Sequence, residues 1–133
     1  MEGVAFSARH LLGECTVAAG RPVDELRLSG GGARSSTWNT IKASVHERPL
    51  VLLTTRDSGV LGAALMGLVA GGLEADIESA AAHRVTVAAT VDPDPAAVPR
   101  LRDLYAIYRE TYAALVPVFT RLASVTAADG RTG

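Results

Sequence analysis

Three consecutive glycines stand between a predicted strand and a predicted helix, and this junction limits the fold more than any other stretch of the chain. It lies within LRLSGGGARSSTWNTIKASV, residues 26–45. Residues 26–28 alternate leucine with arginine, which predicts a short strand with one covered face. After the glycines, apolar residues recur at helical spacing. They predict a helix over residues 35–47 with Ser35 or Ser36 as its cap.

A glycine turn between a strand and a helix allows a ligand to approach the backbone closely, because glycine has no Cβ and tolerates φ > 0. The helix N-terminus adds unpaired N–H groups and a partial positive charge, so the junction suits a nucleotide. The alternative is a tight turn that binds nothing, and spacing alone leaves both interpretations open. No Gly-Lys-Ser/Thr follows, as a phosphate-binding P-loop would need. Gly30 and Gly32 fit the dinucleotide fingerprint, but Ser35 replaces its third glycine, and Thr54 and Thr55 stand where an acidic residue would end the next strand.

The rest of the chain alternates helical and extended patterns. We expect a helix over 2–18, a strand over 49–55, a helix over 58–72, a short helix over 77–83, an extended or looped connection over 85–99 and a final helix over 100–122. The helix at 58–72 is apolar all round and should be buried. Pro117 should kink the final helix. This order predicts an α/β fold with two adjacent parallel strands, and since two strands are marginal, further strands should come from a missing segment or a partner.

The first predicted helix starts at the beginning of the chain with no capping residue before it. Val4, Leu11 and Leu12 fall near one face and should point to the core. An element that opens without a cap suggests that the chain is a piece of something longer.

Composition excludes several classes of protein. The chain has 133 residues and a formal net charge of -1, which predicts one compact domain and argues against nucleic acid or an anionic membrane as partner. Cys15 is the only cysteine, which excludes an internal disulfide, and we expect it to be buried. His10, His46 and His83 lack metal-ligand spacing. The longest uncharged stretch, 58–73, is too short for a membrane helix, so a soluble cytoplasmic protein is expected.

Four blocks in fixed order carry a family resemblance: EGVAFSARHLL, LRLSGGGARSSTWNTIKASV, GVLGAALMGLVAGG and LYAIYRETYAAL. Over about residues 2–116 the chain resembles the C-terminal part of FGGY-family carbohydrate kinases, most closely the xylulokinase-like members. The resemblance implies part of an actin-like and hexokinase-like ATPase domain, related to ribonuclease H, with few parallel strands and a helical C-terminus. In such kinases the sugar lies deep in a cleft and ATP lies on the C-terminal side.

The resemblance assigns the glycine block to the nucleotide, as ATP or ADP with Mg²⁺. Gly30 and Gly31 correspond to glycines beneath the nucleotide, and Gly32, Ala33 and Arg34 complete the turn. Ser35 stands where some relatives place an asparagine at the adenine. Ser44 departs from the family pattern, where an aspartate is usual. Asp57 stands near the position of a usual glutamate.

The resemblance also implies what the chain lacks. The family's phosphate loop, sugar-binding residues and catalytic aspartate lie upstream, so we assign no catalytic and no metal-binding residue here. Residues 1–123 should form an incomplete nucleotide-side portion of the kinase domain, and 124–133 a flexible tail. The expected function is the ATP-binding region of a kinase for a pentulose such as xylulose, or for a related sugar or polyol. The chain should be inactive without the missing N-terminal half or a complementary chain, and homo-oligomers are possible. The alternatives are a non-catalytic nucleotide-binding or interaction module, or an inactive remnant.

Overall fold

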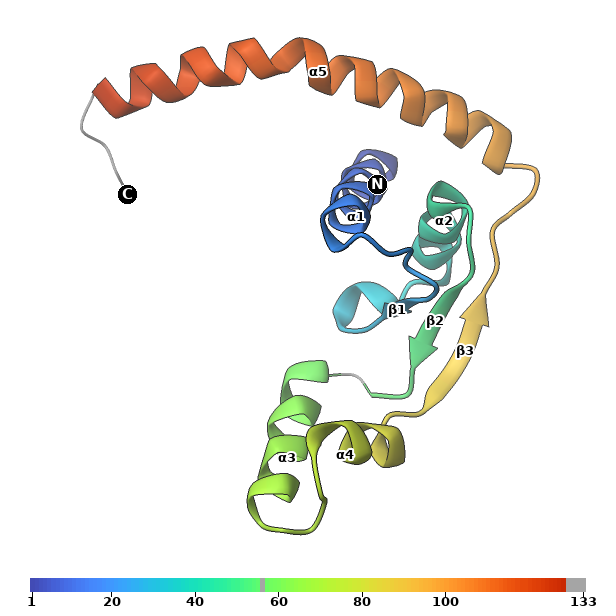
Figure 1. The fold of residues 1–133 in the computed structure, drawn as a ribbon. Coiled ribbons are helices and arrows are strands. Elements are labelled where there is room, and N and C mark those ends of the chain that lie inside the picture. The colour runs from blue at the N-terminus through green and yellow to red at the C-terminus, as the bar shows by residue number, and fades with distance from the viewer. Residues whose placement is uncertain (56, 129–133) are drawn as a thin grey trace.

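The computed structural model describes residues 1–55 and 57–128. Its elements in chain order are α1 (Glu2–Ala19), β1 (Leu26–Leu28), a 3-10 turn η1 (Gly31–Ala33), α2 (Ser36–His46), β2 (Leu50–Leu53), α3 (Ser58–Ala70), α4 (Ile77–Arg84), β3 (Val87–Val91) and α5 (Val98–Ala128) (Figure 1). The mixed α/β class agrees with the prediction. Within the described residues, no helix is both long enough and apolar enough to cross a membrane.

The sheet contains the two predicted parallel strands and one strand that the sequence did not predict. β1 and β2 run parallel, with Leu26 opposite Leu50. β3 pairs antiparallel with the other edge of β2, and the hydroxyls of Thr54 and Thr86 lie 2.6 Å apart where the pairing ends. The expectation of only two strands was wrong. Residues 85–99 were expected to be extended or looped because of their prolines, but all of those prolines follow β3.

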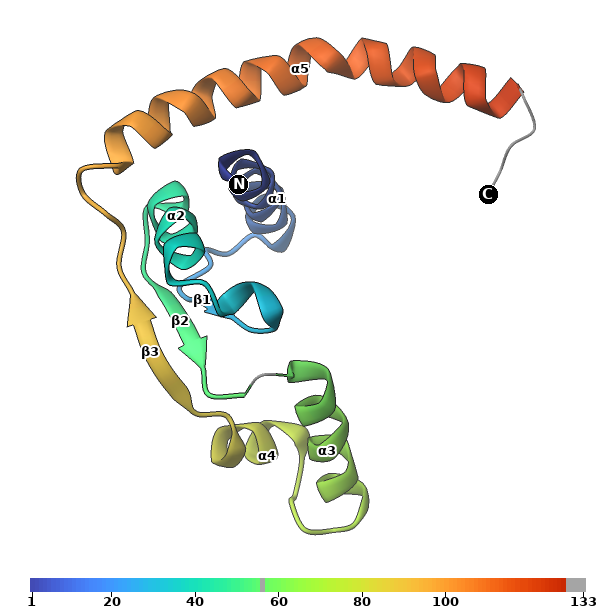
Figure 2. The ribbon, with the colours of Figure 1, turned by 180° about the vertical axis from the view of Figure 1, so that it is seen from behind.

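The core lies where α1, α2 and α5 meet above one end of the sheet (Figures 1 and 2). Phe6, Val45 and Leu101 are buried together there. The phenyl ring of Phe6 lies with its centroid 5.8 Å from that of Tyr108 on α5. The predicted inner face of α1 was wrong at Val4 and Leu11, which are exposed, whereas Leu12 is partly buried. Phe6 and its neighbour Ala5 are the buried residues of this helix. The aromatic side chains of α5 decide which face of α1 is covered.

The ends of the helices follow the predicted capping chemistry. Gly20 ends α1 in the left-handed conformation with φ 63°, and Ser35 caps α2 by accepting a hydrogen bond from the Trp38 N–H at 3.2 Å. Asp57 caps α3 by accepting from the N–H groups of Gly59 and Val60. Asp57, which stands near the position of a glutamate in the family pattern, thus has a local structural role as the cap of α3.

The apolar helix α3 is not buried, contrary to the prediction. Leu65 is its only buried residue, whereas Val60 and Met66 are exposed. α3 packs on α4, and the pair projects from the end of the sheet opposite α5 (Figure 1). Cys15 is also exposed, contrary to the prediction, although it lines a cavity between α1 and β1. The apolar character of α3 therefore reflects contacts that the described part of the chain does not make.

The final helix is longer than predicted. α5 continues to Ala128, past residue 124 where a tail was expected, and residues 129–133 lie outside the described part. Pro117 lies inside the helix, which arches over α1 and α2 and then extends beyond them (Figures 1 and 2). Leu115 and Phe119 on this distal part are exposed. Only the first half of α5 contributes to the core.

Candidate functional site

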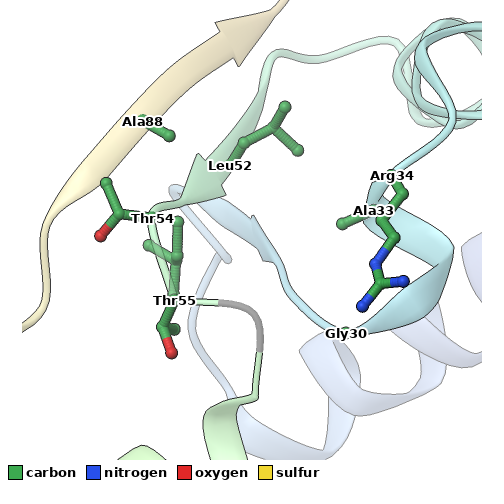
Figure 3. Close-up of a pocket in the computed structure, with 8 residues that line it drawn as sticks. Gly30, Ala33, Arg34, Leu52, Thr54, Thr55 and Ala88 are labelled. Atoms are coloured by element: carbon green, nitrogen blue, oxygen red, sulfur yellow. The ribbon is translucent and has the colours of Figure 1, made fainter.

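A cavity of about 370 Å³ opens at the carboxyl ends of the parallel strands β1 and β2 (Figure 3). Its walls come from the glycine loop, from the end of β2 and from β3. The lining residues are Gly30, Ala33, Arg34, Leu52, Leu53, Thr54, Thr55 and Ala88. In α/β sheets, ligands bind outside the carboxyl ends of parallel strands, so both the topology and the cavity favour this place as the functional site.

The backbone of the loop requires glycine at one of its three glycine positions. Gly30 has φ 77° and ψ −171°, a combination that essentially only glycine adopts. A Cβ on Gly31 would meet no atom within 4 Å, and one on Gly32 would lie 3.8 Å from Nε1 of Trp38. The fold therefore requires glycine at Gly30. At Gly31 it leaves open space above the backbone that a ligand can use.

Two side chains of α2 hold the loop in place. The amide Nδ2 of Asn39, which is buried, donates to the carbonyl oxygen of Ala33 at 2.7 Å. The ammonium of Lys42 donates to the carbonyl oxygen of Gly32 at 3.3 Å and lies 5.3 Å from the centre of the Trp38 ring. Burial lowers the pKa of Lys42 from its usual value. Asn39 was not singled out from sequence, because it lies beside the apolar stripe of Trp38, Ile41 and Val45 and not within it.

The predicted site residues occupy different positions relative to the cavity. Gly30 lines it, and Gly31 and Gly32 form the adjoining turn. Ser35 does not line the cavity, and its hydroxyl caps α2. Where these residues would touch a ligand remains a prediction.

The structure adds cavity residues that were not assigned to the site from sequence, including Arg34, which was expected only to complete the turn. Arg34 lies on one side, and Thr54 and Thr55 lie on the other (Figure 3). From sequence, the threonines were noted only because they stand where an acidic residue would be expected. Their position directly after a strand parallel to β1 was the signal that could have identified them.

The electrostatics of the cavity favour an anion. Arg34 brings a guanidinium to the wall, the threonines bring hydroxyls, and none of the described lining residues is acidic. Asp57, the next carboxylate along the chain, is engaged in capping α3. Among the described residues, no group of three or more His, Cys, Asp or Glu side chains could hold a metal ion. The cavity can thus bind a group rich in anionic oxygens, but it offers no carboxylate ligands for Mg²⁺.

Comparison with known proteins gives the family. Residues 1–71 match the model of the C-terminal domain of the FGGY family of carbohydrate kinases. The chain is 32% identical over 126 residues to an erythritol kinase from Brucella abortus, which covers 93% of this chain and 24% of that protein. It is 27% identical over 112 residues to a xylulose kinase from Bacillus subtilis, which covers 84% of this chain and 22% of that protein.

The comparison with solved structures points to the same family. The crystal structure of xylulose kinase from Rhodospirillum rubrum superposes with a TM-score of 0.69 at 32% identity, covering 90% of this chain and 24% of that one. The chain thus spans about a quarter of the length of the relatives it matches. This chain belongs to the FGGY family of carbohydrate kinases and corresponds to the C-terminal domain of its members.

Proposed function

We propose that the cavity beside Gly30 is the nucleotide side of a sugar kinase and holds the ADP portion of ATP. The observation that carries the proposal is the glycine-only backbone of Gly30 in the wall of an acid-free cavity, at the carboxyl ends of two parallel strands, in a chain of this family. The surrounding fold would then be part of an actin-like ATPase domain, as the family resemblance implies.

Each residue around the cavity has a role in this proposal. The open space above Gly31 lets the phosphates approach the backbone, and Arg34 pairs with their oxygens. Thr54 and Thr55 form the opposite wall, where their hydroxyls donate to the carbonyl oxygens of Thr86 and Asp57 and so hold that wall in place. Ser35 keeps the N-terminus of α2 in place beside the loop, and a contact with the adenine would use the proton of its hydroxyl.

The proposed reaction transfers the γ-phosphoryl group of ATP to a hydroxyl of a pentulose such as xylulose, or of a related sugar or polyol. Relatives named for xylulose and erythritol motivate this range of substrates. Phosphoryl transfer depends on positioning and on charge stabilisation. This chain contributes positioning of the nucleotide. The base, the sugar site and the protein ligands of Mg²⁺ would come from the part of the kinase outside it.

We propose that this remaining part of the kinase is the partner of the chain. About three quarters of each relative's length lies outside the match, and the chain leaves apolar surface uncovered on α3 and on the distal part of α5. β1 is an edge strand whose outer side can take another strand. The same uncovered surface favours a second candidate, an interaction module without catalysis. Turnover after mixing with the upstream half of a kinase would separate the two.

Nucleotide binding is tested through the single tryptophan. Trp38 lies beside Gly32, so its fluorescence reports both unfolding and the loop. We expect Mg-ADP to raise the unfolding temperature, since a ligand at 100 times its Kd stabilises the folded state by about 2.7 kcal/mol. Gly31→Asp should abolish this rise, because it places a carboxylate in the open space where phosphates would lie. Its own stability should change little.

The matched control is Gly3→Asp, in the first turn of α1, which adds the same charge at another open position. It should keep the response to Mg-ADP. A response that survives in Gly31→Asp would remove the loop from the site. No response in the unchanged chain would mean that this chain does not bind ADP by itself, and would overturn the proposal for it.

A further inference from the structure

A second cavity, of about 320 Å³, lies at the opposite end of the sheet from the glycine loop. Pro22 and Val23, which precede β1, and Arg48, which precedes β2, form part of its wall. The cavity therefore opens at the amino ends of the same strands whose carboxyl ends form the candidate nucleotide site. α1 closes one side, through Arg9 and Thr16.

We propose that this cavity binds a small oxyanion, a phosphate or carboxylate group, between Arg9, Arg48 and His46. This inference goes beyond the proposed function and does not depend on it. The structure brings these side chains together from α1, from the end of α2 and from the turn between α2 and β2.

The cavity offers donors that the fold does not use fully. Arg48 donates from Nη1 to the carbonyl oxygen of Val23 at 2.8 Å, which leaves the N–H groups of its Nε and Nη2 for a ligand. Arg9 uses Nη1 for the carbonyl of Val45 and for Glu47. Nδ1 of His46 is buried without a hydrogen-bond partner among the described residues. An oxyanion in the cavity can accept from the arginines, with the imidazole of His46 in the same wall.

The local charge is positive. The pKa of His46 is lowered from 6.5 to about 4, mainly by burial and then by the charges of Arg9, Arg48 and Lys42. Arg27 of β1 lines the neighbouring apolar cavity, as His46 also does, but its charge is paired with Glu25. The tyrosine that α5 brings to the wall, Tyr105, holds the Arg9 guanidinium 4.4 Å from its ring centre.

Two features near the cavity disfavour an anion, but they are weaker than the cationic wall. Glu47 is the nearby carboxylate, and its charge is shared between Arg9 and Arg102. The end of α2 carries partial negative charge, but the N–H groups of Glu47 and Arg48 already bind its last carbonyls. A bound oxyanion would therefore meet a cationic wall, and it would favour the protonated form of His46.

Proton NMR titration of the full chain between about pH 3 and pH 8 tests the proposal, with inorganic phosphate as the probe and sodium chloride at equal ionic strength as the reference. An opposite charge within hydrogen-bond range shifts a pKa by about 1 unit or more, so phosphate should raise the pKa of His46 by at least that amount. His10 and His83 lie outside this cavity and serve as internal controls. Their titration should not respond.

Arg48→Gln should raise the starting pKa of His46, because it removes one of the cations that lower that pKa, and should abolish the response to phosphate. Arg121→Gln makes the same change in net charge on the exposed part of α5 and should keep the response. The proposal is overturned if phosphate leaves the pKa of His46 unchanged, whether the cavity fails to bind or the chain does not form it. It is also overturned if Arg48→Gln responds like the unchanged chain.

Discussion

At the residue scale, the three glycines have different roles, and neighbouring substitutions can separate them. Gly30 has positive φ and extended ψ, whereas Gly31 has neither a positive φ nor an atom near its missing Cβ. The first glycine is thus required by the backbone, and the second is free to serve a ligand. Replacing each glycine with alanine adds a Cβ, and the change in stability measures the difference between the two positions.

We predict that Gly30→Ala destabilises the chain by about 1 to 3 kcal/mol, because the side chain is forced into a conformation that only glycine adopts easily. Gly31→Ala should be neutral, or stabilising by up to about 1 kcal/mol, because alanine reduces the entropy of the unfolded chain. Urea unfolding followed by Trp38 fluorescence measures both. Equal effects of the two substitutions would show that Gly30 is not held at positive φ.

The sequence located the glycine loop and the serine cap, because both depend on local chemistry. It could not show which glycine the backbone requires, since φ at Gly30 depends on how the folded loop joins β1 to α2. It also could not place Arg34 and Thr54 on opposite walls of one cavity, because that arrangement requires β1 and β2 to pair.

At the scale of elements, Glu47 joins three helices. It ends α2 with φ 55°, and its carboxylate binds Arg9 of α1 at 2.8 Å and Arg102 of α5 through two guanidinium nitrogens. Its side chain is 23% exposed, so water screens the cluster only partly. The hydrogen bond from Arg102 is the main cause that lowers the pKa of Glu47 from 4.5 to about 2.

We predict that Glu47→Gln destabilises the chain by about 1 kcal/mol at pH 7, the range expected of a partly exposed charged cluster. A carboxylate with a lowered pKa stabilises the folded state fully above its ordinary pKa, and this contribution is lost as the pH falls through the lowered value. The gap in unfolding temperature between the two proteins should therefore close between about pH 4.5 and pH 2.

Glu25→Gln is the matched control for that substitution. Glu25 pairs with Arg27 two residues away on the surface, and the loss of an exposed local pair should change stability little. A gap for Glu47→Gln that stays constant in acid would mean that its charge does not join the helices.

The elements show the same limit on prediction from sequence. Helix boundaries set by Gly20 and Ser35 were predicted well, because caps are local. The buried face of α1 was not, because Phe6 is covered by tyrosines about a hundred residues later in the chain. The antiparallel strand β3 was missed for a similar reason. Its exposed, alanine-rich sequence becomes a strand only by pairing with β2.

At the scale of the whole molecule, the core and the uncovered apolar surface lie on different parts of the chain. α5 contributes Leu101 to the core near its start, whereas Leu115 and Phe119 further along are 40% and 53% exposed. Contiguous exposed apolar surface on a protein marks an interaction site or a tendency to associate. The distal part of α5 should therefore govern how the isolated chain behaves in solution and contribute little to how it folds.

We predict that the chain self-associates as its concentration rises, and that the double substitution Leu115→Lys with Phe119→Lys reduces this association without lowering the unfolding temperature. The two lysines remove apolar surface from α5 but touch no buried residue of the core. Sedimentation velocity over a range of concentrations measures the first effect, and thermal unfolding measures the second. Val4→Lys with Val17→Lys, at residues of α1 that are 67% and 80% exposed, adds the same two charges as a control and should leave association unchanged. If both variants reduce association equally, general charge repulsion governs it, and the apolar surface of α5 has no special part. If the double variant unfolds at a lower temperature, the distal helix supports the fold, and the separation of core from binding surface in this chain is wrong.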